Sequence, residues 1–356
     1  MHTTNRGFTL IEIMVASAVF AIFMIGILNL LDTSTRISVV ETELSDTQEN
    51  VRFAAYHIMR TARMMGSAMM PMAANVAGTD TWVAGSLDSD QSTNFTTPFG
   101  AVAVVDGSDV LTLRGFFEVA PFFTDRTDIM GPPHRVEVNE SDGGILINDN
   151  FDSVDAANLE GRGLFFSGKI DQNEYAVGQI GNGATITGTA PNRTLSIKYA
   201  GGSSQWYGLN PTGAAMTIPP AFDVYRVGVM DSYTYYVRPD FTLMRMRADS
   251  SGGGATPQPV AVNIGSLQVA FGLDTSTPSD GVVDTWAAAP TAATVVAANR
   301  VVAMRITVLG RTPRAVPGWT EPVATFTVED MDITDIDREH KWRRIEVVAA
   351  LRNYLF

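Results

Sequence analysis

The first apolar segment of the chain is also its most uniform. From Phe8 to Leu31 the sequence reads FTLIEIMVASAVFAIFMIGILNLL, a run in which Glu12 is the only charged residue. As a helix, this run is about 36 Å long, which exceeds the roughly 30 Å of hydrocarbon in a bilayer. The pattern therefore predicts a membrane-spanning helix over residues 8–31.

A helical pattern continues beyond this segment and predicts an amphipathic stalk helix over residues 32–70. Apolar residues recur at a seven-residue spacing, at Ile37, Leu44, Val51, Ile58 and Met65, and a second seam position is occupied by Val40, Thr47, Ala54 and Thr61. Thr47 and Thr61 make this stripe too polar for a freestanding coiled coil. We expect it to pack on the protein's own sheet, with helices of neighbouring subunits as the second possibility.

The periodicity changes from helical to strand-like after residue 70. Short apolar alternations are separated by clusters of Gly, Asp, Asn, Ser and Pro. The expected strands cover residues 101–105, 110–114, 135–138, 144–148, 194–199, 223–230, 234–238, 243–247, 268–272, 301–308, 323–328 and 344–350. The sequence thus predicts an α+β protein in which a long N-terminal helix packs on a mostly antiparallel, β-rich outer domain, residues 71–356.

A glycine-rich segment at 249–257 is the best candidate for an internal boundary of the outer domain. Apolar alternation resumes directly on both sides of it. We therefore favour a hairpin connection over a linker between domains.

Composition and charge exclude several classes of function. The formal net charge is −13, so the surface has no overall basic footprint for nucleic acid. The chain contains no cysteine, which removes disulfides and sulfur-ligated zinc sites. No nucleophile elbow, phosphate-binding loop or H-E-x-x-H helix is present, so the sequence predicts neither an enzyme nor a bound cofactor.

The residues before the membrane segment set its orientation. The leader MHTTNRG is short and polar, and Arg6 predicts that the N-terminus stays in the cytoplasm. A secretory signal would carry its cleavage site after the apolar run, whereas here the basic residue and the glycine precede it. The outer domain is therefore expected on the far side of the membrane.

The string from Arg6 to Ala16, RGFTLIEIMVA, resembles the prepilin signal of type IV pilins and type II secretion pseudopilins. This resemblance implies that residues 1–7 are a leader removed by prepilin peptidase between Gly7 and Phe8. It also implies that Phe8 becomes N-methylated and that Glu12 acts in subunit assembly. Many major pilins carry a proline within this helix, where the present chain has Gly26, and this departure favours a minor subunit.

The place of Glu12 has a physical rationale that does not depend on the family. A carboxylate inside an apolar membrane helix is costly unless it finds a partner. Cleavage would free a positive amine on Phe8, about one helical turn away. Glu12 of an incoming subunit can then neutralise the Phe8 amine of its neighbour and set the axial register between the two.

Further segments resemble PilW-type minor pseudopilins. In the stalk these are QENVRFA, from Gln48, and RTARMMG, from Arg60. The second half, residues 223–356, resembles these proteins around 235–245, 260–274 and 343–353. Residues 72–222 match nothing that we recognise and are expected to be an insertion.

The resemblance implies a minor pilin that is incorporated into a type IV pilus and primes its assembly, near the tip. Implied partners are prepilin peptidase, other minor and major pilins, the inner membrane and the pilus assembly platform. The implied location is the inner membrane, with the C-terminal domain periplasmic, and later the extracellular pilus. Two alternatives remain open: a tip adhesin built from residues 72–222, and a minor pseudopilin of a type II secretion system.

One loop carries a candidate metal site. Asp274, Asp280 and Asp284 lie among oxygen-bearing residues with a glycine that allows a sharp turn, as calcium loops require. The spacing does not fit an EF-hand, no glutamate closes the loop and Pro278 interrupts it. A solvated hairpin turn is therefore the favoured interpretation.

Overall fold

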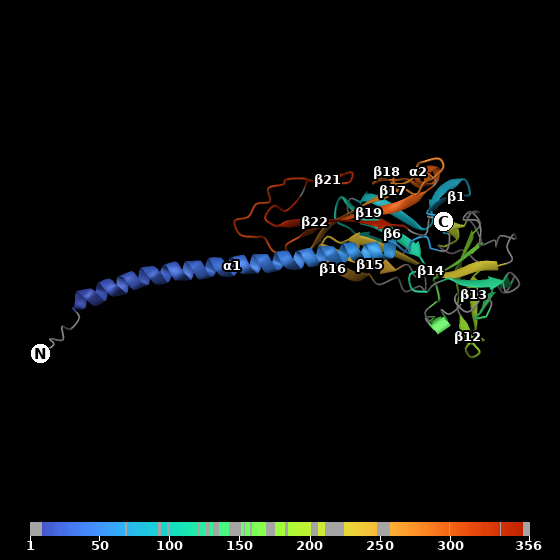
Figure 1. The fold of residues 1–356 in the computed structure, drawn as a ribbon, viewed down its shortest axis with the longest axis horizontal. Coiled ribbons are helices and arrows are strands. Elements are labelled where there is room, and N and C mark those ends of the chain that lie inside the picture. The colour runs from blue at the N-terminus through green and yellow to red at the C-terminus, as the bar shows by residue number, and fades with distance from the viewer. Residues whose placement is uncertain are drawn as a thin grey trace.

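The computed structural model places most of the chain. It describes residues 9–67, 70–91, 94–97, 100–119, 121–125, 129–130, 135–141, 151–152, 154–156, 159–168, 175–181, 184–200, 206–210, 224–247, 257–298, 300–334 and 336–351. Figure 1 shows a long helix that projects far out of a β-rich body. The predicted α+β class is confirmed.

The helix α1 runs without interruption from Leu10 to Ala62, so the predicted membrane and stalk segments form one element. Thr9 caps its first turn, and the glutamate three residues later completes a capping box. At the other end, Gly66 adopts a positive φ of 67°, a conformation that glycine tolerates without strain. The chain then enters the outer domain.

Only the second half of α1 packs on the outer domain. Its buried residues share one face and are Thr47, Val51, Ala54, Ala55, Ile58, Thr61 and Ala62. The expected packing of the stalk stripe on the protein's own sheet is confirmed for this part. The stripe is not covered throughout, however, because Ile37 is 53% exposed.

The larger of the two main sheets contains 12 strands. They are β3 (Gly85–Gln91), β6 (Ser108–Gly115), β7 (Phe122–Asp125), β8 (Ile129–Met130), β9 (Arg135–Asn139), β10 (Gly163–Gly168), β11 (Tyr175–Ile180), β12 (Thr185–Thr187), β13 (Thr194–Ala200), β14 (Val224–Val237), β15 (Thr242–Arg247) and β16 (Gln258–Val262). All strand pairs among the described residues are antiparallel. Strands β3 and β6 to β13, which come from the unmatched segment 72–222, share this sheet with β14, β15 and β16.

Strand β14 organises this sheet. Its first part pairs with β7 and β10, and its second part pairs with β6 and β15. The sequence predicted two strands here, at 223–230 and 234–238, and that prediction was wrong. Asp231 and Ser232, which interrupt the apolar pattern, lie in the ladder opposite β6.

The second main sheet has the order β18-β17-β19-β22. Its strands are β17 (Ile264–Leu273), β18 (Thr285–Ala287), β19 (Val301–Arg311) and β22 (Trp342–Ala350). Asn263, with a φ of 62°, forms the corner through which β16 leads into β17. Because β15 and β16 pair directly, residues 248–256 connect neighbouring strands, as the hairpin interpretation predicted.

Smaller elements complete the outer domain. Within the described residues, three separate two-stranded sheets are formed by β1 (Ala73–Val76) with β2 (Thr79–Trp82), β4 (Asn94–Thr97) with β5 (Gly100–Ala103), and β20 (Phe326–Val328) with β21 (Met331–Ile333). There are also a short helix α2 (Ala292–Ala298) and a 3₁₀ turn η4 (Tyr207–Leu209). The expected strand at 144–148 lies outside the described residues.

The main hydrophobic core joins the helix to both sheets. It includes Val51 and Ile58 of α1, Tyr235 of β14, Phe271 of β17 and Ile306 of β19. A second core, under β9 to β13, is built around residues such as Phe166 and Leu195. The second half of the helix is therefore a structural part of the outer domain.

Candidate functional site

The start of α1 holds the acidic residue of the membrane segment in a defined position. The Thr9 backbone N–H donates to Glu12 Oε2 at 2.8 Å, and the Thr9 hydroxyl donates to the same oxygen at 2.9 Å. In return, the Glu12 N–H donates to Thr9 Oγ1 at 3.3 Å. The carboxylate thus lies at the N-terminal end of the helix, where the unpaired N–H groups favour a negative charge.

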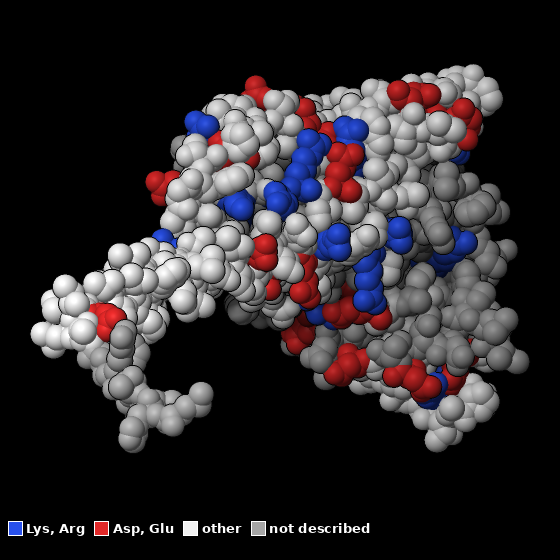
Figure 2. All heavy atoms as spheres, turned by 60° about the vertical axis from the view of Figure 1, so that its left-hand side comes forward, with Lys and Arg blue, Asp and Glu red and all other residues white. Residues whose placement is uncertain are grey.

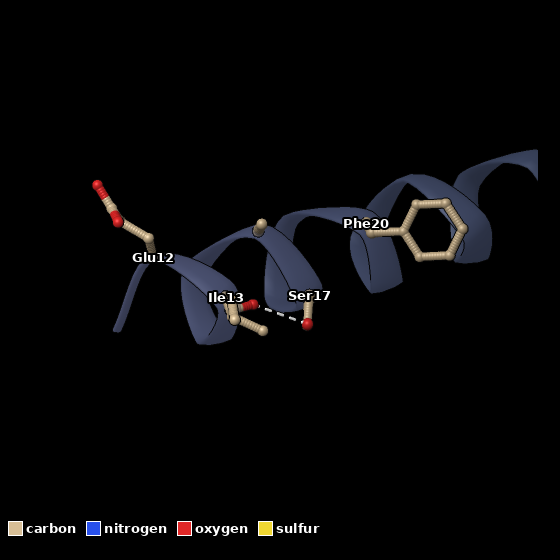
Figure 3. A pocket seen from close by; sticks show the side chains of 5 residues that line it. Glu12, Ile13, Ser17 and Phe20 are labelled. Atoms are coloured by element: carbon tan, nitrogen blue, oxygen red, sulfur yellow. Dashed lines mark hydrogen bonds between the residues drawn. The ribbon is translucent and has the colours of Figure 1, made fainter. Parts of the chain in front are cut away.

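The close-up view shows how Glu12 relates to the residues after it. Glu12, Ile13, Ala16, Ser17 and Phe20 line a shallow hollow on the helix surface, with the carboxylate directed toward the start of the helix (Figure 3). The Ser17 hydroxyl donates to the Ile13 carbonyl oxygen at 2.8 Å. This side chain is therefore satisfied within the helix, as a polar residue in a lipid environment must be.

The first half of α1 exposes apolar side chains on every side. Leu10 is 79% exposed, Phe20 65% and Ile22 71%. An apolar stretch of this helix has a mean hydropathy of 2.5, and none of it is buried. Its length and composition therefore suffice to cross a membrane. In Figure 2 the projecting segment is almost free of charge, whereas Lys, Arg, Asp and Glu gather on the outer domain.

Gly26 lies within this exposed segment. A Cβ added at this position would meet nothing within 4 Å in the isolated chain. The packing of the subunit itself therefore does not require glycine here. Close approach of a second membrane helix is one setting that would use the small residue.

Two contacts fix the stalk to the outer domain. The Thr47 hydroxyl donates to the Glu43 carbonyl oxygen at 2.7 Å and lies 3.3 Å from the Arg311 carbonyl oxygen. Near the end of the helix, the hydroxyl oxygens of Thr61 and Tyr235 are 2.9 Å apart in a buried hydrogen bond. These two threonines, which make the seam poor for a coiled coil, are therefore used to bind the sheets.

The processing residues named from the sequence, Gly7 and Phe8, lie outside the described residues. Of the three predicted assembly and processing residues, the structure therefore places Glu12 alone. Cleavage and methylation stay predictions.

The structure brings two of the three calcium candidates together in a hydrogen-bonded turn. Asp274 accepts hydrogen bonds from the Ser279 hydroxyl and from the Ser276 and Gly281 N–H groups. Asp284 accepts from the N–H and hydroxyl of Thr275 and from the Ser276 hydroxyl. Asp280 accepts from the Val282 N–H.

The carboxylates of this turn therefore already have partners from its own donors. Within the part of the chain that the structure describes, no group of three or more His, Asp or Glu side chains is arranged to hold a metal ion.

A buried charge cluster escaped the sequence analysis. The Asp231 side chain is 0% exposed and its Oδ1 lies 3.6 Å from Arg162 Nη1 and 3.8 Å from Arg247 Nε. Both arginines also contact Glu118, and the Tyr233 hydroxyl donates to that carboxylate at 3.0 Å. Burial, opposed by the Arg162 charge, raises the pKa of Asp231 to about 6. The four charged residues are far apart in sequence, so no local pattern could have revealed them.

Comparisons with known proteins divide the chain into two matched parts. Residues 3–28 match the family described as Prokaryotic N-terminal methylation motif, and residues 225–353 match Type IV Pilus-assembly protein W. The stalk segments after residue 28 fall outside both matches, so their resemblance to PilW-type proteins stays a prediction. No curated protein matches the chain.

Among solved structures, the chain is similar to a type IV-like pilin, TTHA1219, from Thermus thermophilus. The two share 12% identity with a TM-score of 0.24, and the alignment covers 55% of this chain and 86% of that one. A likeness this distant bears on neither fold nor function. The two family matches, over residues 3–28 and 225–353, are the comparisons that bear on the function of the chain.

Proposed function

We propose that the chain is a type IV pilin-like minor pilin with a PilW-type C-terminal segment, on the strength of its two family matches. It is inserted in the inner membrane, processed at Gly7, and incorporated into a type IV pilus whose assembly it primes near the tip. The outer domain faces the periplasm before assembly and the exterior afterwards. Its partners are prepilin peptidase, the assembly platform, and other minor and major pilins.

The observation that carries this proposal is the uncovered first half of α1. A helix that exposes apolar side chains all round, in a protein whose second half of the same helix is well packed, requires an apolar environment from elsewhere. The membrane supplies it before assembly. Other pilin helices supply it in the filament, where the subunit leaves the lipid.

Glu12 favours movement of the subunit from the membrane into the filament. Within the subunit its carboxylate accepts hydrogen bonds from Thr9 alone among the residues described. In the assembled filament it neutralises the amine of a neighbouring processed Phe8, a stronger partner because the amine is charged. Extraction from the membrane into the filament is then favoured over remaining in lipid.

The size of the outer domain supports a place near the tip. Sheets of 12 and 4 strands make a body much wider than the helix that carries it. Such a body is accommodated more easily at the end of a filament than in a closely packed shaft.

Substitutions at Glu12 test the assembly mechanism. Glu12→Gln retains a side chain that can complete the capping box but removes the charge, whereas Thr9→Val removes the cap and keeps the charge. We expect Glu12→Gln, like Glu12→Val, to accumulate in the membrane without filament incorporation. Thr9→Val should still assemble. Filament counts, with immunoblots of membrane and sheared fractions, measure both effects.

Normal piliation by Glu12→Gln, with the variant present in the filaments, would overturn the charge-pairing mechanism. A variant that is degraded would instead report on folding, and the membrane immunoblot identifies that case. Priming is tested separately by deleting the gene, which should abolish filaments and not merely shorten them.

A further inference from the structure

A projection of the outer domain extends along α1 toward the membrane segment. It is formed by residues 312–325, which connect β19 to β20 and which we call the finger. In Figure 1 this connection reaches farther along the helix than any other described part of the outer domain. At its start the Arg311 carbonyl oxygen lies 3.3 Å from the Thr47 hydroxyl, and farther on Arg314 Nε lies 3.9 Å from Glu43 Oε1. Between these two contacts the finger approaches the membrane segment by about one helical turn.

Hydrogen bonds give the finger a fixed shape. Three of its backbone N–H groups donate to carbonyl oxygens of the returning segment 338–341, at 2.7, 2.8 and 2.9 Å. Between these bonds the chain makes a tight turn, in which the Trp319 N–H donates to the Val316 carbonyl oxygen at 2.9 Å. Gly318 has a φ of 74° there, as the third position of a type II turn requires. The finger therefore holds its exposed side chains in a defined arrangement.

The exposed surface of the finger differs in charge from the chain as a whole, whose net charge is −13. Glu321 is the only acid of the finger and is 8% exposed, whereas the Arg314 side chain is 80% exposed. Trp319 is half-buried, with Lys341 Nζ 4.6 Å from its ring centre. The other exposed residues are uncharged: Pro313, Ala315, Pro317, Gly318, Thr320, Pro322, Val323 and Ala324. Exposed basic, aromatic and apolar side chains without acids suit the surface of a membrane.

The anchor helix places the finger close to such a surface. With residues 8–31 in the membrane, as proposed, Glu43 follows the last membrane residue by 43 − 31 = 12 positions, roughly 18 Å of helix. The headgroup layer covers about 5–7 Å of this interval. The finger extends beyond Arg314 into the remainder (Figure 1). A helix tilt of about 20°, usual for membrane helices, brings the side that carries the finger closer still.

From these relations we infer that the finger docks on the lipid headgroups of the membrane that holds α1, before the subunit enters a filament. Arg314 contacts anionic headgroup phosphates, and the uncharged surface around Val323 lies against the headgroup layer. A subunit held by one helix alone can rotate about that helix. The second point of contact fixes the tilt of α1 and the direction in which the outer domain faces. The inference rests on the proposed function, because that function places residues 8–31 in a membrane.

Fluorescence quenching by lipid tests the contact. The chain has no cysteine, so a single introduced one carries the only label. The full chain, labelled at Thr320→Cys, is reconstituted into vesicles of phosphatidylethanolamine and phosphatidylglycerol that contain a lipid with a spin-labelled headgroup. We expect this label to be quenched severalfold more strongly than one at Thr285→Cys, a matched exposed threonine of β18. Equal quenching at the two positions would overturn the inference.

Charge reversal tests the contact between Arg314 and lipid phosphates. Arg314→Glu should lower the ratio of docked to undocked fingers about tenfold in these vesicles, because attraction to anionic lipid becomes repulsion. Quenching at Thr320→Cys measures that ratio. Lys198→Glu, an equal charge change on an exposed residue of β13, is the control and should have no effect. If Arg314→Glu leaves the quenching intact, or lowers it equally in vesicles of phosphatidylcholine alone, the charge does not act on anionic lipid and the inference is wrong.

Two further measurements distinguish this inference from its alternatives. Diluting the protein in lipid should leave the quenching unchanged, because each finger contacts the membrane of its own anchor. Loss of quenching on dilution would assign the finger to a second copy of the chain and overturn the inference. Alkaline extraction of cell membranes reports on the anchor itself. A chain that resists extraction but has an unquenched finger contradicts the inference alone, whereas a chain released by alkali contradicts the membrane insertion in the proposed function.

Discussion

The hydroxyl oxygens of Thr61 and Tyr235 lie 2.9 Å apart and are buried between the last turn of α1 and strand β14. This hydrogen bond joins α1 to the strand that pairs with β6, β7, β10 and β15. The Tyr235 hydroxyl also lies 3.3 Å from His57 Nδ1, one turn earlier on the helix. The end of the stalk is thereby tied to the centre of the larger sheet.

Removing the tyrosine hydroxyl should weaken the docking of the helix. Tyr235→Phe keeps the ring in the core but leaves the Thr61 hydroxyl with only its weaker contact to the His57 carbonyl oxygen, at 3.3 Å. We expect a loss of about 1 kcal/mol in the free energy of unfolding. Urea denaturation of the full chain in detergent measures this loss. Tyr56→Phe, an exposed residue of the same helix, should leave the midpoint unchanged.

Gly310 of strand β19 lies close against α1. A Cβ added here would overlap the Cγ2 atom of Val51. Gly310→Ala should therefore separate the helix from the sheet and cost about 1–3 kcal/mol by overpacking. Gly208→Ala is the control, since a Cβ there meets nothing within 4 Å. Equal denaturation midpoints for the two variants would show that the helix does not dock on β19 in this way.

The buried Asp231 predicts an unusual dependence of stability on pH. Its folded pKa of about 6 lies above the ordinary value of 3.8 because burial disfavours the charged form. The folded state thus binds this proton more tightly than the unfolded state does. The contribution of Asp231 to stability is full below about pH 4 and is lost as the pH rises to about 6, by at most about 3 kcal/mol.

Denaturation at several pH values tests whether the contribution of Asp231 to stability falls as the pH rises. Asp231→Asn cannot ionise, so the unfolding free energy of the native protein minus that of the variant should fall between pH 4 and pH 6. Of the groups that surround the carboxylate, Glu118 has a pKa that is lowered, against the effect of its burial, by the hydrogen bond and charge of Arg162. A difference that rises with pH would mean that the ion pairs with the two arginines outweigh the cost of burial.

Processing is tested by the mass of the mature protein. We expect the chain isolated from cells to begin at Phe8 and to carry one added methyl group on its amine. Gly7→Val should block this cleavage and leave residues 1–7 attached, while Gly26→Val, at a glycine with free space around it, should be processed normally. A native mature chain that begins at any other residue would contradict the proposed route of assembly.

How far the sequence alone reaches differs between the two halves of the protein. It predicted a helix long enough to span a membrane, the isolated position of Glu12 in it, a helical continuation beyond it and the β-rich outer domain, although the helix ends at Ala62 and not at the predicted residue 70. Each of these depends on residues a few positions apart, so apolar periodicity and turn residues report them directly. The sequence did not predict strands β10 and β11, and it divided β14 into two strands. A short segment of sequence does not show with which distant strand it pairs.

Tertiary structure alone decided which residues meet across the fold. It placed strands β3 and β6 to β13 of segment 72–222 in the same sheet as β14, joined Thr61 to Tyr235, and buried Asp231 between Arg162 and Arg247. It also left one side of the stalk uncovered while burying the other. Such contacts depend on register and packing between distant segments, and local sequence specifies neither until the strands have paired.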